Sequence, residues 1–327
     1  METIIKILKK IHMYNWAVKV VTNHRIRKNL TKNYKFEDRR KNKEKLCIIL
    51  SGYKEFLFDV YFKRLKMFLP DDVEVCLCSS GKYSEKLSNI AKENDWSYLS
   101  TKRNNVSLIQ NVAIKLFENA EYIYKIDEDI MITDGFFKTL YETLKDCEKN
   151  GEYKPGFIAP TIPINGFSNM LILKRFDLID TYTKLFERPI YAAGRDRMVE
   201  NNPEAAKFFW GKDGYLPSID EMNAIVQKDN FEYVACPIRF SIGAILFTRK
   251  FYEEMGMFHV FHGAGMGGDE TQICEYCMSS SHAIIVSKNT IVGHLSFSEQ
   301  NKEMKKYFET HQEVFDIEIK SKEKKLV

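Results

Sequence analysis

Short apolar runs alternate with segments of helical periodicity between residues 46 and 129, and this alternation limits the folds open to the chain. We expect strands at 46–50, 73–78, 96–99 and 122–126, and helices at 56–68, 83–94 and 106–118. Strands connected by helices of this length form a sheet that helices cover on both faces. The sequence therefore predicts an α/β fold with a mostly parallel central sheet, followed by an irregular second half.

Polar residues follow two of these strands directly. Ser51, Gly52 and Tyr53 come after the first strand, and Asp127 and Asp129 come at the end of the fourth. Ligands of such sheets bind at the carboxyl ends of the strands. Because residues i and i+2 of a strand point to the same side, the two carboxylates repel each other unless a cation or a proton lies between them. Mg2+ and Mn2+ favour carboxylates together with substrate phosphates, so the pair predicts a metal that holds a diphosphate. A solvated acidic turn is the alternative.

Charge is distributed unevenly along the chain of 327 residues. Residues 1–45 contain 14 Lys and Arg against 4 Asp and Glu, whereas the rest contains 35 against 41. The body is therefore acidic, which disfavours nucleic acid as a partner. No apolar run approaches the roughly 20 residues that span a bilayer. Seven scattered cysteines do not resemble a disulfide scaffold, and we expect a cytoplasmic protein.

The basic segment 1–45 is expected to form an arm and a linker outside the globular domain. Ile4, Leu8 and Ile11 share one helical face, and lysines occupy the other positions. A basic amphipathic helix is typical of a protein that lies on an anionic membrane surface, here the inner face of the plasma membrane. Packing of this helix on the body or on another subunit is the alternative.

The remaining boundaries follow from the element pattern. We expect one globular domain at 46–300, divided into a nucleotide-binding half at 46–135 and an acceptor-binding, catalytic half at 136–300. Residues 301–327 are expected to form a helix and a charged tail.

The second half contains a glycine-rich loop over residues 263–268 that ends in Asp269 and Glu270. Glycines allow the backbone to approach a ligand closely. The two acids precede a helix expected at 271–278, and the helix dipole favours acids there, which is the structural alternative to a catalytic role. Farther on, short strands are expected at 283–286 and 290–292, before Gly293 and His294.

Three of these motifs resemble those of a known family when they are taken in order. Lys-Ile-Asp127-Glu-Asp129, Gly267-Gly268-Asp269-Glu270 and Gly293-His294 resemble the motifs of GT-A nucleotide-sugar glycosyltransferases, in particular bacterial family 2-like enzymes. The resemblance covers about residues 46–297 and implies a Rossmann-like GT-A domain. It implies an enzyme that moves a sugar from a nucleotide-sugar, with a UDP-sugar expected, to a glycan or lipid-linked acceptor in surface polysaccharide biosynthesis.

The resemblance also implies roles for the residues near the diphosphate. Asp129 would bind Mn2+ or Mg2+ directly, and His294 would be the third protein contact to the metal. Asp127 would contact the ribose, or the metal through water.

Further nucleotide contacts are implied at two places. The turn Ser51-Gly52-Tyr53 would lie against the base. Arg103 and Asn111 occupy the region where the family carries Asn-x-Gly and Arg-Asn, although this chain lacks both the glycine and the arginine pair.

Transfer would be a single displacement with inversion, in which a carboxylate removes the proton of the acceptor hydroxyl. By analogy with enzymes that carry Gly-Gly-Glu-Asp, the second acid, Glu270, would be the base; the reversed order of the acids here leaves Asp269 as a rival. Residues expected to contact the acceptor are Trp210, Tyr215, Gly267 and Gly268, although an aromatic cluster is equally typical of a core.

Two other classes of protein fit the sequence less well. A non-catalytic carbohydrate- or nucleotide-binding scaffold is disfavoured, because Asp127, Asp129, Glu270 and His294 are all intact. A nucleotidyltransferase usually carries a basic, glycine-rich loop after its first strand, and residues 51–54 (Ser-Gly-Tyr-Lys) match that pattern poorly.

Overall fold

The computed structural model describes residues 28–192, 197–261, 267–297 and 299–317. The predicted amphipathic helix, residues 263–266 of the glycine-rich loop and the end of the charged tail lie outside the described residues.

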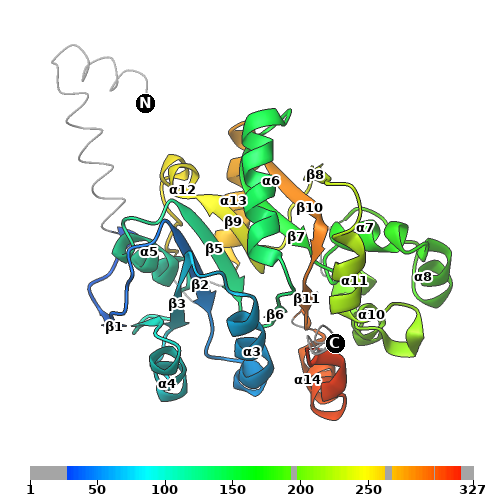
Figure 1. Ribbon diagram of the computed structural model, residues 1–327, viewed down its shortest axis with the longest axis horizontal. Coiled ribbons are helices and arrows are strands. Elements are labelled where there is room, and N and C mark those ends of the chain that lie inside the picture. Colours follow the sequence, from blue (N-terminus) through cyan, green and yellow to red (C-terminus); the bar gives the residue numbers. More distant parts are fainter. Residues whose placement is uncertain (1–27, 193–196, 262–266, 298, 318–327) are drawn as a thin grey trace, which may run out of the picture.

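A single large sheet organises the described residues. Nine strands form it in the order β1-β4-β3-β2-β5-β9-β7-β10-β8 (Figure 1). Their bounds are β1 Tyr34–Glu37, β2 Lys45–Leu50, β3 Val73–Ser80, β4 Ser97–Thr101, β5 Tyr122–Asp127, β7 Lys154–Thr161, β8 Tyr233–Cys236, β9 Ala244–Thr248 and β10 His282–Ile291. From the pairings, β1, β8 and β9 oppose the other six strands. The predicted α/β fold with a mostly parallel sheet is therefore confirmed.

Helices cover the sheet on both faces. In the view of Figure 1, α6 lies in front of the sheet and α13 behind it, while α7, α8, α10 and α11 gather beyond β10. The longer helices are α3 Phe58–Phe68, α4 Glu85–Glu93, α5 Val106–Leu116, α6 Phe136–Asn150, α7 Ser168–Arg175, α11 Ile219–Val226, α13 Gly268–Ser279 and α14 Asn301–Thr310. The shorter ones are α8 Ile179–Leu185, α9 Met198–Asn201, α10 Pro203–Phe209, α12 Arg249–Met255, α15 Gln312–Phe315 and the 3-10 turns η1 Glu55–Leu57 and η2 Lys212–Gly214.

Local sequence signals fix the starts of several helices. The Asn105 side chain caps α5 by accepting from the Leu108 N–H at 2.9 Å. Ser218 and Glu221 form a capping box at the start of α11. Such caps satisfy backbone N–H groups that the first turn of a helix leaves free.

One expected boundary is wrong. Residues 34–37, assigned to the linker, form the edge strand β1, which pairs antiparallel with β4. The segment after β1 is also anchored, because the buried carboxylate of Glu74 accepts from the backbone N–H groups of Lys41 at 2.8 Å and Lys43 at 2.9 Å. The polar composition of this stretch hid its attachment, since the partners lie far along the chain.

The two short strands expected at 283–286 and 290–292 form one strand, β10. Its pairing with β7 shifts register between Val286 and Ile291, which marks an irregularity where the sequence pattern breaks. The amide of Asn289 donates to the carbonyl groups of Val226 at 3.1 Å and Asn230 at 2.9 Å, so the irregular part of the strand is tied to the loop after α11.

Apolar side chains form two buried clusters. The larger cluster fills both faces of the sheet, and the smaller one lies among the helices beyond β10 together with α14 and α15. Arg64, fully buried on α3, joins the smaller cluster to the rest: it pairs with Asp220 at 2.7 Å and donates to the Phe315 carbonyl at 3.0 Å. Residues 301–317 are thus part of the folded body. Among the described helices, none has the length and apolarity to cross a bilayer.

Candidate active site

Two of the predicted acids lie at the centre of the sheet edge where the parallel strands end. Asp127 is the last residue of β5, which pairs with β2 on one side and with β9 on the other. Its backbone N–H donates to the Gly243 carbonyl at 2.8 Å. Asp129 follows in the tight turn between β5 and the short strand β6 (Ile130–Met131).

His294 reaches the same place from the far end of the sequence. It lies in β11 (Gly293–His294), which pairs with β6 so that His294 is opposite Ile130. The Leu295 N–H donates to the Asp129 carbonyl at 3.0 Å, and His294 Nε2 lies 3.5 Å from Asp129 Oδ2. The structure therefore brings together the acid and the imidazole that the sequence analysis assigned to the metal.

Glycine is required before this histidine. A Cβ at Gly293 would lie 2.3 Å from Cη2 of Trp210, so only glycine fits there without displacing the ring. The Trp210 indole N–H in turn donates to the His294 carbonyl at 3.0 Å. Trp210 therefore supports the strand that carries His294.

Each of the paired acids already has a cationic partner from this chain. Lys125 Nζ lies 2.7 Å from an Asp127 carboxylate oxygen and also donates to the Ile242 carbonyl at 2.8 Å. Lys54 Nζ contacts Asp129 Oδ2. The charge repulsion that led us to expect a metal is thus offset, in the protein alone, by two ammonium groups.

The pKa values of the two acids are shifted in opposite directions. Burial raises the pKa of Asp127 to about 6, and Asp129 adds to this rise while Lys125 opposes it. Burial alone would also raise the pKa of Asp129, but the charges of Lys54 and His294 outweigh it and hold that pKa well below its usual range. Asp129 is therefore the permanent anion of the pair.

Glu128, between the two aspartates, has a different function from either. Its carboxylate is buried and accepts from the N–H groups of Gly52 at 2.7 Å and Tyr53 at 3.0 Å. Burial raises the pKa of Glu128, although these backbone donors oppose the rise. The turn at residues 51–53 and the acid loop are thus joined into one unit.

The turn presents an aromatic surface to solvent. Tyr53 is 58% exposed, and its hydroxyl donates at 2.6 Å to the carbonyl of Ser80, the last residue of β3. Gly52 has a φ of 127°, a backbone conformation that favours glycine. The Ser51 hydroxyl is buried and has no hydrogen-bond partner among the described residues.

The two other predicted nucleotide contacts, Arg103 and Asn111, differ in their access to solvent. Arg103 is exposed and donates to the Phe261 carbonyl at 2.5 Å. Asn111 is fully buried: its amide donates to the carbonyl groups of Asn29 and Phe258, and its oxygen accepts from the Tyr252 hydroxyl at 2.8 Å. With these bonds made inside the core, Asn111 has no surface for a nucleotide, and we correct that assignment.

The acids of the glycine-rich loop lie in the first turn of α13. Asp269 is buried and accepts from the Gln110 amide at 2.8 Å, and its charge contributes to the raised pKa of Asp127. Glu270 is 21% exposed and pairs with Arg239 at 2.6 Å. The two candidates for the base therefore differ in access to solvent as well as in partner.

Of the expected acceptor contacts, Trp210 needs correction. It is only 3% exposed, belongs to the smaller apolar cluster and packs 4.5 Å from the Phe315 ring, so no sugar can stack on it. Tyr215 keeps 43% of its surface exposed beside Phe208. Gly267 is exposed and Gly268 begins α13, next to the part of the loop that lies outside the described residues.

Two protein ligands at this site could hold a divalent metal. Among the described residues, no group of three or more His, Cys, Asp and Glu side chains is arranged to hold an ion. Asp129 and His294 supply two ligands that converge, an oxygen and an imidazole nitrogen of the kind Mn2+ accepts. Mg2+ and Mn2+ sites often contain one or two protein ligands, with water and substrate phosphates completing them. The donor set therefore suits a metal that binds together with a diphosphate.

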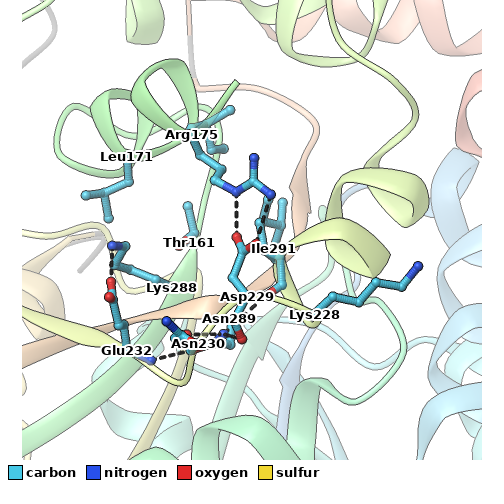
Figure 2. Close-up of a pocket in the computed structure, with 12 residues that line it drawn as sticks. Thr161, Leu171, Arg175, Lys228, Asp229, Asn230, Glu232, Lys288, Asn289 and Ile291 are labelled. Atoms are coloured by element: carbon cyan, nitrogen blue, oxygen red, sulfur yellow. Dashed lines mark hydrogen bonds and ion pairs between the residues drawn. The ribbon is translucent and has the colours of Figure 1, made fainter. Parts of the chain in front are cut away.

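A separate cavity of about 470 Å³ lies between α7, β10 and the loop after α11 (Figure 2). Arg175 and Asp229 form an ion pair at its wall, with atoms 2.9 Å apart, and Lys288 pairs with Glu232. None of the predicted site residues lines it. This cavity is therefore not the candidate active site, which is identified by the position of its acids.

The sequence analysis assigned no role to four residues of the site, which are Lys54, Lys125, Glu128 and Arg239. Lys125 has a local signal, because it precedes Asp127 by two positions and shares its side of the strand. Lys54 has none, since 75 positions separate it from Asp129.

Comparisons with known proteins were made at the levels of sequence and structure. No protein-family model and no curated protein matches the sequence. Among solved structures, GalNAc-T7 with UDP, GalNAc and Mn2+ matches 80% of this chain at 11% identity and a TM-score of 0.45, and this chain spans 45% of that one. A mannosyltransferase from Pyrobaculum calidifontis with GDP-Man and Mn2+ matches 90% of this chain and 68% of its own, at 14% identity and a TM-score of 0.43. A cytidylyltransferase from Leptospira borgpetersenii matches 43% of this chain and 65% of its own, at 16% identity and a TM-score of 0.29.

Proposed function

We propose that the protein is a glycosyltransferase that takes a sugar from a nucleotide-sugar donor with the help of Mn2+ or Mg2+. The observation that carries the proposal is the convergence of Asp127, Asp129 and His294 at the end of β5, with His294 Nε2 3.5 Å from Asp129 Oδ2. An acid and an imidazole that are 165 positions apart in the sequence meet at the sheet edge where α/β folds bind ligands.

The donor's diphosphate would bind with the metal at Asp129 and His294. When bound, the metal supplies charge neutralisation for the departing diphosphate. Asp127 would act beside it, on the ribose or through water. The exposed ring of Tyr53 offers an apolar face to a nucleotide base, and Glu128 holds the N–H groups of its turn in place. Arg103, which is exposed, remains a proposed contact to the nucleotide.

Glu270 is our choice for the base that accepts the proton of the acceptor hydroxyl. Its side chain reaches solvent, as a base that meets an incoming acceptor must, whereas Asp269 is 4% exposed. Glu270 would exchange Arg239 for the acceptor, and Asp269 would hold the donor sugar near Asp127. Attack on the anomeric carbon from the side opposite the diphosphate gives inversion. Tyr215, Gly267 and Gly268 remain the proposed acceptor contacts.

The test compares Glu270→Gln and Asp269→Asn with Glu275→Gln, an exposed glutamate on the same helix. UDP-, GDP- and CMP-sugars are first screened for thermal stabilisation that depends on Mn2+. We expect Glu270→Gln to lose transfer and donor hydrolysis by about 10²–10⁴-fold with donor affinity retained, and Glu275→Gln to match the wild type. Retained turnover in Glu270→Gln moves the base to Asp269. A protein that neither binds nor hydrolyses any donor would be a non-catalytic module.

The acceptor and the location follow from the basic arm. We propose a glycan or lipid-linked acceptor of surface polysaccharide synthesis, and association of residues 1–27 with the anionic inner face of the plasma membrane. The deletion that tests this must stop before β1, since that strand belongs to the sheet. Removal of residues 2–27 is expected to shift the protein from vesicles with phosphatidylserine to the supernatant, and an unchanged bound fraction refutes the association.

A further inference from the structure

Lys54 places a positive charge on the oxygen that a metal at this site would need. It follows the turn at residues 51–53, and its side chain is 23% exposed. Its ammonium contacts Asp129 Oδ2 and lies 3.3 Å from Asn301 Oδ1, at the start of α14. The Ser296 hydroxyl donates to the same Asn301 oxygen at 2.7 Å. Lys54 is therefore held at a defined position.

The same carboxylate oxygen faces His294, whose Nε2 lies 3.5 Å from it. A metal that takes Asp129 and His294 as ligands must therefore bind beside the lysine ammonium. Two cations in contact with one oxygen repel each other strongly where little water screens them, and the Asp129 side chain is only 11% exposed. Lysine and metal thus exclude each other at Asp129 Oδ2.

We propose that Lys54 is the counter-ion of Asp129 in the free protein and moves to the donor's diphosphate when the metal takes its place. The inference rests on the proposed function and adds to it a residue that couples the binding of the metal to the binding of the diphosphate. Lysine suits this exchange, because its ammonium is a point charge on a flexible stem and binds phosphate readily. Asn301 gives the ammonium a neutral second contact, so the lysine does not depend on Asp129 alone.

A thermodynamic consequence follows from this exchange. Metal alone must displace Lys54 without offering it an anion, so it binds weakly. Metal and nucleoside diphosphate together give Lys54 a new partner, so each strengthens the binding of the other, and linkage makes the two effects equal. Removal of the lysine charge should strengthen the binding of metal alone and reduce the coupling.

The experiment measures Mn2+ binding by calorimetry without nucleotide and with saturating UDP or GDP. It compares the wild type, Lys54→Met, Lys54→Arg and a control, Lys86→Met; Lys86 lies on α4, with its ammonium 5.1 Å from the ring of Phe58. We expect Lys54→Met to bind Mn2+ alone about tenfold more tightly and to lose about tenfold of the coupling. Lys54→Arg and Lys86→Met are expected to resemble the wild type.

The outcomes separate this inference from the proposed function. If the wild type binds Mn2+ with UDP or GDP but Lys54→Met binds Mn2+ alone no more tightly, the inference is wrong and the glycosyltransferase proposal stands. If the wild type binds no nucleoside diphosphate with Mn2+, both are overturned. Lys54→Gln replaces Lys54→Met if the latter does not fold, since it removes the charge and keeps a hydrogen-bond donor.

Discussion

Replacement of Trp210 by phenylalanine tests whether this ring supports the histidine, as the structure indicates. The change removes the indole N–H that donates to the His294 carbonyl at 3.0 Å and leaves a gap beside Gly293. A lost hydrogen bond costs about 1 kcal/mol, and the smaller ring in a buried place costs about 1–2 kcal/mol more. We therefore expect the free energy of unfolding to fall by about 2–3 kcal/mol.

The expected change in melting temperature follows from the size of the protein. Unfolding entropy of about 2.1 cal/mol/K per residue over 327 residues is about 0.7 kcal/mol/K. The Trp210→Phe protein should therefore melt about 3–4 °C lower. The Trp210 hydrogen bond orients the backbone of His294, the proposed metal ligand. The affinity of the Trp210→Phe protein for Mn2+ in the presence of UDP or GDP should therefore fall by about tenfold.

Trp96→Phe is the matched control, because Trp96 is 6% exposed and belongs to the larger apolar cluster. It should lower the melting temperature and leave the Mn2+ affinity unchanged. Calorimetric melting and Mn2+ titration of both variants provide the comparison. Equal Mn2+ affinities in the two variants would show that Trp210 only fills space, and the reasoning about His294 would be wrong.

Three further predictions concern stability. Because the pKa of Asp127 is about 6 in the fold, above its ordinary value of 3.8, its favourable contribution is present below about pH 4 and lost as the pH rises to 6. With 35% of the side chain exposed, Asp127→Asn should stabilise the metal-free protein by only about 1 kcal/mol at pH 7 and leave it unchanged at pH 3.5, measured by urea unfolding. Gly293→Ala should cost about 1–3 kcal/mol in the wild type but less in Trp210→Phe, where the two clashing indole atoms are gone and only Cδ1 of Ile219, at 2.9 Å, still has to move; equal costs in both backgrounds contradict the clash with Trp210. Arg64→Met should lower the free energy of unfolding by about 3–5 kcal/mol, because it leaves Asp220 unpaired. Lys63→Met, at an exposed position, should lower it by less than about 0.5 kcal/mol, and similar urea midpoints for the two variants would refute this reasoning.

The fold was predictable from the sequence because its signals are local. Apolar runs and helical repeats from residue 46 to 129 correspond to β2, α3, β3, α4, β4, α5 and β5 within a few residues. The sheet edge at Asp127 then follows from the rule for parallel strands. The convergence of His294 with Asp129 was expected only from the family resemblance, since no local pattern specifies it.

The errors share a physical cause. Trp210 and Asn111 carry polar atoms that can contact a ligand, but here those atoms satisfy buried carbonyl groups far along the chain. Lys54 was missed for the same reason, since its partner is distant in sequence. Composition and spacing reveal which groups can form hydrogen bonds, whereas the distribution of those bonds between core and ligand depends on the tertiary structure.

The buried contact of Arg64 with the Phe315 carbonyl has a consequence for synthesis of the protein. These residues lie 251 positions apart, so at ribosomal speeds of about 5–20 residues per second the arginine emerges about 10–50 s before its partner. During that interval the guanidinium on α3 lacks one of its acceptors, and the apolar side chains that α14 and α15 later cover stay open to water. Nascent chains of this protein are therefore expected to be vulnerable to aggregation and proteolysis until α14 and α15 appear, and stalling before them would leave one side of the sheet uncovered.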